Sequence, residues 1–126
     1  MIVGIGVDVV DIARFERAMS RTPRLGARLF TASELVKDGK PRSLRSLAGR
    51  FAAKEALIKA FGDSEGVHWQ DIRVVNDDLG SPAFELSGST LEVAAAKGID
   101  RMHLSMTHDA GLSIAYVIAE SRGDRA

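Results

Sequence analysis

The chain has 126 residues, no cysteine, a formal net charge of zero and 45% hydrophobic residues. This composition predicts one domain with its own apolar core, and it excludes disulfide scaffolds, thiolate zinc sites and cysteine nucleophiles. Zero net charge argues against general nucleic-acid binding, and no apolar run approaches the length of a membrane span. The apolar N-terminus has no basic leading segment, so we expect a strand there rather than a signal peptide, and a cytoplasmic protein.

Residues 2–10 are rich in Ile and Val and predict a strand with two different faces. One face is apolar, whereas the other consists of Gly4, Gly6 and Asp8. Glycine inside a strand indicates that a backbone or a ligand approaches closely. Two interpretations remain open here. The strand crosses close to another element with Asp8 as a strand-end cap, or the glycines leave room for a ligand beside the carboxylate.

The next segment predicts a basic helix over residues 12–20, with Asp11 as its N-cap. Three cations share one face of this helix at helical spacing: Arg14, Arg17 and Arg21. Five arginines and only one Glu lie between residues 13 and 28, so the local field is strongly positive. The face is either a solvated surface or a docking site for an acidic partner, whose association a positive field would speed.

A capping-box pattern, Thr31 followed by Glu34, predicts a short helix after residue 30. The central helix is predicted over residues 43–61, with Gly62 as its stop. Glu55 lies in the middle of an apolar arc of that helix, which a buried carboxylate tolerates only beside a cation or hydrogen-bond donors. Either Glu55 forms an internal pair with Lys59 one turn later, or Glu55 holds a metal and Lys59 holds an anion.

The second half of the chain predicts short strands and one helix. Strands are expected at residues 71–75, 83–86, 101–107 and 112–119, with a helix at 90–97 capped by Thr90. A turn at 108–111 joins the last two strands, and the charged tail from Glu120 is expected to fray. The fold class is therefore α+β: a single compact domain over residues 1–126, in which an antiparallel sheet packs on the long central helix.

Asp8 and Glu55 together suggest a magnesium site. Mg²⁺ takes hard oxygen ligands and commonly uses one or two carboxylates plus substrate phosphates. Three cations on the central helix could meet those phosphates: Arg50, Lys54 and Lys59. From this chemistry alone, the chain is read as a magnesium-dependent enzyme acting on a phosphate ester.

Several motifs carry a resemblance that covers nearly the whole chain. They are GIGVD at residues 4–8 followed by Asp11 and Arg14, Phe30-Thr31 with Glu34, RFAAKEALIKA at 50–60, and SMTH at 105–108. In this order they resemble holo-[acyl-carrier-protein] synthase, the small bacterial type of 4′-phosphopantetheinyl transferase. Two positions depart from the common pattern of that family. Thr107 stands where many relatives carry Ser, and Ser81 precedes Pro82 where many carry Lys or Arg.

The resemblance implies coenzyme A as donor, a serine of an apo acyl carrier protein as acceptor, and 3′,5′-ADP as the leaving product, in fatty acid biosynthesis. It implies that Asp8 and Glu55 bind Mg²⁺ with the CoA pyrophosphate, and that Lys59 neutralises charge near the attacked phosphate. It also implies a homotrimer with active sites between subunits.

The resemblance suggests roles for further residues. Arg50, Lys54 and Thr107 are expected at the coenzyme. His108 is expected to act as the base for the serine hydroxyl or as a hydrogen-bonding partner of CoA, with Asp109 fixing its tautomer. Carrier-protein docking is expected at the face formed by Arg14, Arg17 and Arg21.

Two rival functions remain compatible with the residues themselves. A magnesium phosphohydrolase would use the same carboxylates on a nucleotide, and a basic adaptor would dock acidic helices without binding CoA. The other histidines and the large aromatics have no motif support, and we expect them to be structural or packing residues: His68, His103, Trp69 and Tyr116.

Overall fold

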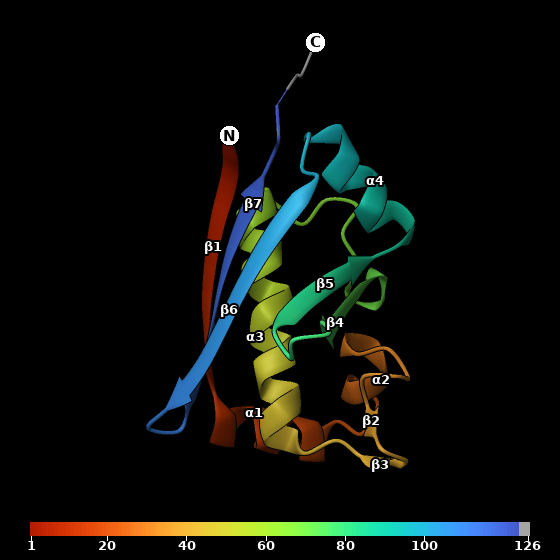
Figure 1. Ribbon diagram of the computed structural model, residues 1–126. Helices are drawn as coiled ribbons and strands as arrows, with labels where there is room; N and C mark the ends of the chain where they lie inside the picture. The colour runs from red at the N-terminus through yellow and green to blue at the C-terminus, as the bar shows by residue number, and fades with distance from the viewer. Residues whose placement is uncertain (124–126) are drawn as a thin grey trace.

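The structure, a computed structural model, describes residues 1–123 and is built around one long helix (Figure 1). This helix, α3, spans Leu44–Phe61, as expected from the sequence. It begins where Ser43 Oγ accepts a hydrogen bond from the Ser46 backbone N–H at 3.1 Å, and it ends at Gly62, whose φ is 96°. The small side chains of Ala52, Ala53 and Ala56 are fully buried, so neighbouring elements approach α3 from several sides.

A three-stranded antiparallel sheet packs on α3. Its strands are β1 (Ile2–Asp11), β7 (Leu112–Glu120) and β6 (Arg101–Asp109), in the order β1-β7-β6. Figure 1 shows the helix lying behind this sheet, along its length. In β1, Asp8 pairs with Ala115 of β7, which places the carboxylate on the helix-facing side together with Gly4 and Gly6.

The two glycines of β1 are there because α3 leaves no space for a side chain. A Cβ atom on Gly4 would lie 1.8 Å from the carbonyl oxygen of Ala60, and one on Gly6 would lie 1.8 Å from that of Ala56. Backbone therefore packs on backbone at this crossing, as the first of the two interpretations of the strand predicts. Gly4 faces Ala60 and Gly6 faces Ala56, so β1 runs toward the start of α3. Asp8, two residues further along β1, therefore lies beside the turn of α3 that precedes Ala56.

The remaining strands form two separate ribbons rather than extending the main sheet. One ribbon pairs β4 (Ile72–Asn76) with β5 (Pro82–Leu86), and a very short one pairs β2 (Val36–Lys37) with β3 (Lys40–Pro41). A 3-10 turn, η1 (Trp69–Asp71), leads into β4, and α4 (Gly88–Ala96) follows β5. The sequence led us to expect one antiparallel sheet, whereas the structure has a three-stranded sheet and two separate ribbons.

The N-terminal helix α1 (Ile12–Arg21) begins as expected, with Asp11 Oδ1 accepting from the Arg14 N–H at 3.0 Å. The short helix expected after residue 30 is wrong. Thr31 and Glu34 exchange the capping-box hydrogen bonds, but they close a single turn, and the short helix α2 (Leu25–Leu29) precedes it. Glu34 is drawn into the core instead of continuing a helix.

Two other boundaries differ from the sequence prediction. Thr90 lies inside α4 rather than at its start, because the carboxylate of Asp71, from η1, accepts from its N–H and hydroxyl and so caps the helix from another segment. Strand β6 runs through His108 to Asp109, and only Ala110 and Gly111, both with positive φ, form the turn to β7. Glu120 is paired within β7, and the last part of the expected tail, residues 124–126, lies outside the described residues.

The sheet face turned away from α3 is apolar and open. On β1, Val3, Ile5, Val7 and Val9 are each at least 41% exposed, and Tyr116 on β7 is 52% exposed. Within residues 1–123, no helix is long and apolar enough to cross a membrane.

Candidate active site

Asp8, Glu55 and Lys59 come together where β1 crosses α3. Lys59 Nζ donates to Asp8 Oδ1 at 3.0 Å and to the carbonyl oxygen of Val7 at 3.1 Å. Asp8 and Glu55 line the same cavity of about 580 Å³, which is bounded mainly by apolar side chains from β1, α1, α2 and α3. The structure therefore brings together Asp8, Glu55 and Lys59, and Lys59 pairs with Asp8 rather than with its helix neighbour Glu55.

Glu55 is half-buried at the edge of this cavity rather than at the centre of the buried stripe. Burial raises the pKa of its carboxyl, and the neighbouring Asp8 carboxylate raises it further. A hydrogen bond from the Trp69 indole N–H and the charge of Lys59 act in the opposite direction on this pKa. The carboxylates of Asp8 and Glu55 therefore repel each other where water is partly excluded. A bound cation would offset this repulsion.

The donor set fits Mg²⁺. Within residues 1–123, no three His, Asp or Glu side chains gather into a cluster that alone would hold a metal ion. Mg²⁺ does not need such a cage, because it usually binds one or two carboxylates and completes its octahedron with water and substrate phosphates. Two adjacent carboxylates at an open cavity are consistent with that chemistry.

Lys54 is buried among protein groups, which argues against its expected role as a phosphate contact. Its side chain is fully buried, and its ammonium donates to Glu34 Oε1 at 2.6 Å, to the carbonyl oxygen of Leu29 at 2.7 Å and to that of Trp69 at 3.2 Å. The ring of Phe30 lies below the ammonium, with its centroid 5.2 Å away. All three hydrogen bonds of the Lys54 ammonium go to protein groups, so Lys54 ties α3 to the segments that contain Leu29, Glu34 and Trp69.

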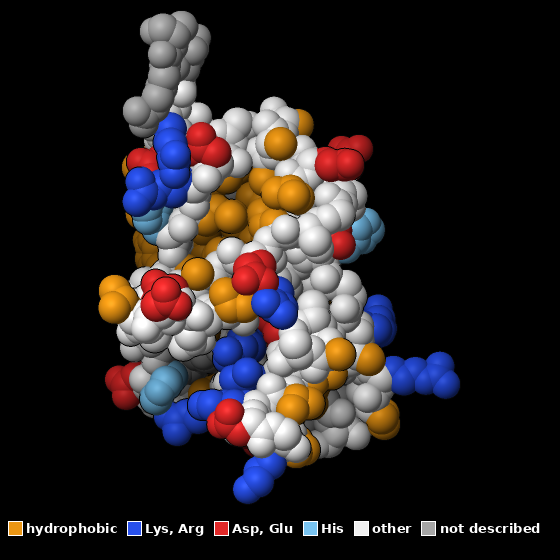
Figure 2. All heavy atoms as spheres, turned by 45° about the vertical axis from the view of Figure 1, so that its right-hand side comes forward, with side chains coloured by type: hydrophobic (Ala, Val, Ile, Leu, Met, Phe, Trp, Pro, Cys, Tyr) orange, Lys and Arg blue, Asp and Glu red, His pale blue; other side chains and the backbone are white. Residues whose placement is uncertain are grey.

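A second group of cations lies at the N-terminal half of α3. Arg50 Nη1 donates to Ser46 Oγ at 2.9 Å, while its buried Nε has no hydrogen-bond partner among the described residues. Burial and the nearby Arg42 lower the pKa of Arg50, so the local charge favours an incoming anion. One cavity of about 620 Å³ here is lined by four cations: Lys37, Arg42, Arg50 and Arg73. Figure 2 shows Lys and Arg side chains gathered in the lower half of the face it presents.

His108 belongs to this second region. Its Nδ1 lies 2.7 Å from Arg45 Nη2, and both residues line a smaller cavity together with Arg50 and Thr107. Arginine only donates, so Nδ1 accepts and the hydrogen of the neutral ring sits on Nε2. Arg45 precedes Glu55 by about 15 Å along the helix axis. A single chain therefore does not bring His108 beside Asp8 and Glu55.

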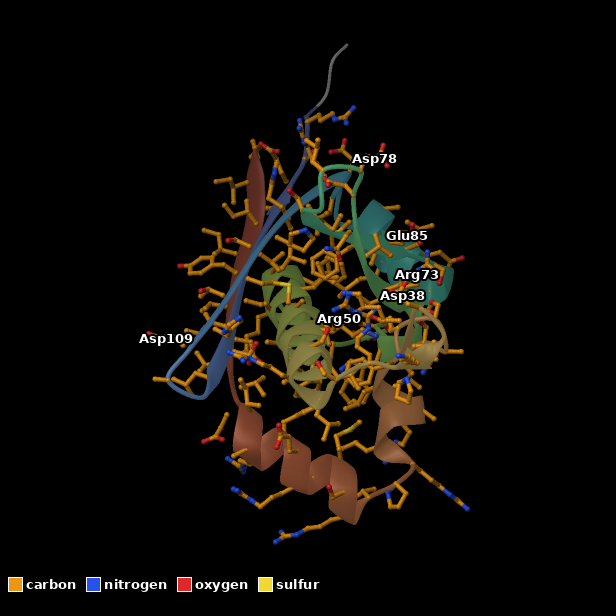
Figure 3. The ribbon with its side chains drawn as sticks, turned by 60° about the horizontal axis from the view of Figure 1, so that its bottom comes forward. Asp38, Arg50, Arg73, Asp78, Glu85 and Asp109 are labelled. Atoms are coloured by element: carbon orange, nitrogen blue, oxygen red, sulfur yellow. The ribbon has the colours of Figure 1, made fainter. Side chains whose placement is uncertain are left out.

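Asp109 does not orient His108, and its expected role in fixing the tautomer is wrong. Consecutive side chains of a strand point to opposite faces, so Asp109 on β6 turns away from its neighbour. Figure 3 shows Asp109 at the tip of the β6–β7 hairpin, on the far side of α3 from Arg73. The partner of His108 is Arg45, which the sequence reasoning missed.

The arginines of α1 are exposed and one of them reaches the first cavity. Arg14, Arg17 and Arg21 all lie on the surface, and Arg14 lines the same cavity as Asp8 and Glu55. The structure thus joins the basic helix face to the pair of carboxylates.

Comparisons with known proteins show which family the chain belongs to. A model of the 4′-phosphopantetheinyl transferase superfamily matches residues 4–116. The chain is 57% identical over 125 residues to holo-[acyl-carrier-protein] synthase of Clavibacter sepedonicus, covering 98% of this chain and 99% of that protein. The crystal structure of the holo-[acyl-carrier-protein] synthase from Neisseria meningitidis superposes with a TM-score of 0.86 at 35% identity, covering 96% of this chain and all of that one.

The Helicobacter pylori holo-[acyl-carrier-protein] synthase, whose structure is a complex with coenzyme A, superposes with a TM-score of 0.79 at 33% identity, covering 92% of this chain and 99% of that one. The chain therefore belongs to the 4′-phosphopantetheinyl transferase superfamily. Within it, the near full-length relatives place the chain among the holo-[acyl-carrier-protein] synthases, which are phosphopantetheinyl transferases. The resemblance seen in the sequence motifs and the α+β fold class are both confirmed.

Proposed function

We propose that this protein transfers the 4′-phosphopantetheine group of coenzyme A to a serine of an apo acyl carrier protein in a Mg²⁺-dependent reaction that releases 3′,5′-ADP. The observation that carries the proposal is the convergence of Asp8, Glu55 and Lys59 at one cavity that an exposed arginine of α1 also lines. By resemblance to the family, we assign the reaction to fatty acid biosynthesis in the cytoplasm.

In this proposal Asp8 and Glu55 hold the metal, which when bound offsets the charge of the CoA pyrophosphate as the phosphate ester is exchanged. Lys59, whose side chain is 55% exposed beside Asp8, would neutralise charge near the phosphate under attack. The acceptor serine oxygen forms a new bond to the β-phosphate of CoA as the pyrophosphate P–O bond breaks. The electron pair of that bond leaves with 3′,5′-ADP, and the serine proton passes to a base. Catalysis is then mainly positioning and charge compensation, with little covalent work for the protein.

We assign the cations near the start of α3 to the coenzyme. Arg45 and Arg50, together with Thr107 and His108, line one cavity where phosphate oxygens would find several donors. Because Arg45 occupies Nδ1 of His108, the free Nε2–H is a donor, which favours a hydrogen bond to CoA over the role of base.

We further propose a homotrimer in which each site is shared between subunits. Two features support it: the residues assigned to the metal and those assigned to CoA line different cavities of one chain, and the outer sheet face exposes Val3, Ile5, Val9 and Tyr116 to solvent. Exposed apolar surface of this kind is typical of an interface.

One assay separates the proposal from its rivals. The protein is incubated with CoA, Mg²⁺ and apo carrier protein, and the mass of the carrier is read. A gain of one phosphopantetheine arm supports transfer, whereas breakdown of CoA without that gain supports hydrolysis. A carrier that binds but keeps its mass, with intact CoA, supports an adaptor.

The shared site has its own test, based on mixing two impaired variants at a CoA concentration too low for His108→Ala to work well. Glu55→Gln and His108→Ala are each purified, then combined under conditions that allow subunits to exchange. If sites lie between subunits, mixed trimers contain some sites with both native residues, and part of the activity returns. If each chain holds a complete site, mixing restores nothing.

A further inference from the structure

Trp69 is the only tryptophan of the chain, and it touches the metal site that we propose. It stands at the start of η1, and its indole Nε1–H donates to Glu55 Oε1 at 3.3 Å. That bond takes one carboxylate oxygen of Glu55 and leaves Oε2 free of any partner among the described residues. An indole N–H is a donor only, so it holds Glu55 as an acceptor.

The main chain of Trp69 is held by a hydrogen bond as well as its ring. Its carbonyl oxygen accepts from the buried ammonium of Lys54, which also binds Glu34 and the carbonyl oxygen of Leu29. Lys54 and Glu55 are consecutive residues of α3. One therefore anchors the main chain of Trp69 while the other receives its side chain, and this clamp ties the position of the indole to the helix that carries the carboxylate.

The clamp also lies at a boundary between two cavities. Glu55 and Trp69 line the cavity that contains Asp8, and they also line a second cavity of about 560 Å³ that contains Arg28 and His68. A glutamate side chain has several rotamers of similar energy. The indole bond favours one of these rotamers at a place where open space lies on both sides.

We propose that Trp69 is a positioning residue that holds Glu55 in its metal-binding orientation, and that its emission reports the binding of a divalent cation there. This inference rests on the proposed function, because it takes Glu55 as a metal ligand. Hydrogen-bonding partners of metal ligands typically affect metal affinity or activity about 10–100-fold when they are removed. Trp69 would then be more than the packing residue that the sequence suggested.

The test titrates the full-length protein with Mg²⁺ alone and follows tryptophan emission. The wild type is expected to show a saturable change, Glu55→Gln to lose it, and Glu85→Gln, a carboxylate on β5, to keep it. In parallel, Trp69→Phe, which keeps a ring but removes the N–H, should raise the Mg²⁺ concentration for half-maximal transfer about 10-fold or more. Trp69→His, which restores an N–H donor, should recover part of that loss, and the Michaelis constant for the carrier should stay within twofold in both.

The outcomes separate the inference from the proposed function. If Trp69→Phe leaves the half-maximal Mg²⁺ concentration within twofold while Glu55→Gln abolishes transfer, the positioning role is overturned and the function stands. If wild-type emission ignores Mg²⁺ at concentrations that saturate transfer, the reporter role is overturned, and this holds even if Trp69→Phe does not fold. If the wild type transfers nothing to a carrier, both the function and the inference are rejected.

Discussion

The ammonium of Lys54 lies 2.6 Å from Glu34 Oε1, and both side chains are inaccessible to solvent, with exposed fractions of 0% and 1%. This ion pair joins segments that are distant in the chain. Glu34 Oε2 also accepts from the backbone N–H of Val74 at 3.0 Å, while Lys54 reaches the end of α2 and the start of η1. The pair therefore fixes the walls of the cavity next to the proposed metal site.

We predict that Lys54→Met strongly destabilises the fold. Removing one partner of a buried pair leaves an uncompensated charge, at a cost of about 3–5 kcal/mol. Denaturant unfolding at neutral pH measures this loss. The matched control is Arg73→Ala, which breaks the exposed pair of Arg73 with Glu85 and should cost about 1 kcal/mol or less. Equal losses in the two variants would contradict a special role for the buried pair.

The case of Lys54 marks a limit of sequence reasoning. Its neighbours in the RFAAKEALIKA motif are correctly placed in a helix, and the capping box correctly pairs Thr31 with Glu34. Neither pattern says that Glu34 turns inward to meet Lys54, because the two residues lie 20 positions apart and only tertiary packing joins them. A lysine in a cationic motif was therefore read as a phosphate contact.

We predict that Gly6→Ala prevents the close crossing of β1 and α3. The new Cβ would lie 1.8 Å from the backbone oxygen of Ala56, and backbone cannot give way as a flexible side chain does. We expect a loss of about 3 kcal/mol or more, the upper end of overpacking effects. Gly49→Ala is the control, because its Cβ would meet the end of the Met106 side chain at 3.0 Å. Thermal unfolding compares the stability of the two variants. If Gly6→Ala is as stable as Gly49→Ala, steric exclusion is not the reason for a glycine at position 6.

We predict that Glu55→Gln makes the metal-free protein more stable at neutral pH while it loses transfer activity. The pKa of Glu55 is raised in the fold, so its ionised form costs stability, and that cost grows as the pH rises from the unfolded pKa to the folded one. The glutamine variant has no such cost. Its advantage in melting temperature, measured without Mg²⁺, should therefore shrink in acid. An advantage that is independent of pH would point to packing instead of charge.

Much of the fold and part of the site could be predicted from the sequence. Hydrophobic periodicity and caps located α1, α3 and the five longer strands, but not α2 or the short strands β2 and β3. The family motifs pointed to Asp8, Glu55 and Lys59. The predictions that failed depended on the direction in which a side chain points and on contacts between residues far apart in the sequence. Strand β6 extends to Asp109, so His108 and Asp109 face opposite sides and cannot pair as neighbours. Arg45 received no role and Trp69 only a packing role, because only the folded chain brings them to His108 and Glu55.

We predict that His108→Ala raises the Michaelis constant for CoA about 10–100-fold, the value of a hydrogen bond to a charged group, with a smaller change in turnover. Asp109→Asn should leave both constants within twofold. Steady-state kinetics with CoA varied at saturating carrier tests this. A fall in turnover of about 10²–10⁴-fold at an unchanged Michaelis constant would instead assign His108 as the base.

We predict that the arginine face of α1 docks the carrier protein. Arg14, Arg17 and Arg21 are exposed, and Arg14 borders the cavity that contains Glu55, so an acidic partner held on α1 would present its serine to the proposed metal site. Charge reversal, Arg14→Glu or Arg17→Glu, should raise the Michaelis constant for the carrier about 10-fold or more and leave that for CoA within twofold. Such contacts act mainly on association and are screened by salt over about 8 Å at physiological ionic strength.

The decisive measurement is a pair of titrations, carrier and CoA, at low and high salt. Added salt should weaken wild-type carrier binding more than that of the reversed variants, because those variants have already lost the attraction that salt screens. Lys97→Glu is the matched control, because it reverses a cation just beyond α4, which lies at the opposite end of the molecule from α1 (Figure 1). It should leave the carrier constant within twofold. If Lys97→Glu weakens the carrier as much as Arg14→Glu does, the effect comes from total charge. If carrier and CoA weaken equally, or if salt leaves wild-type carrier affinity unchanged, the arginine face is only a solvated surface.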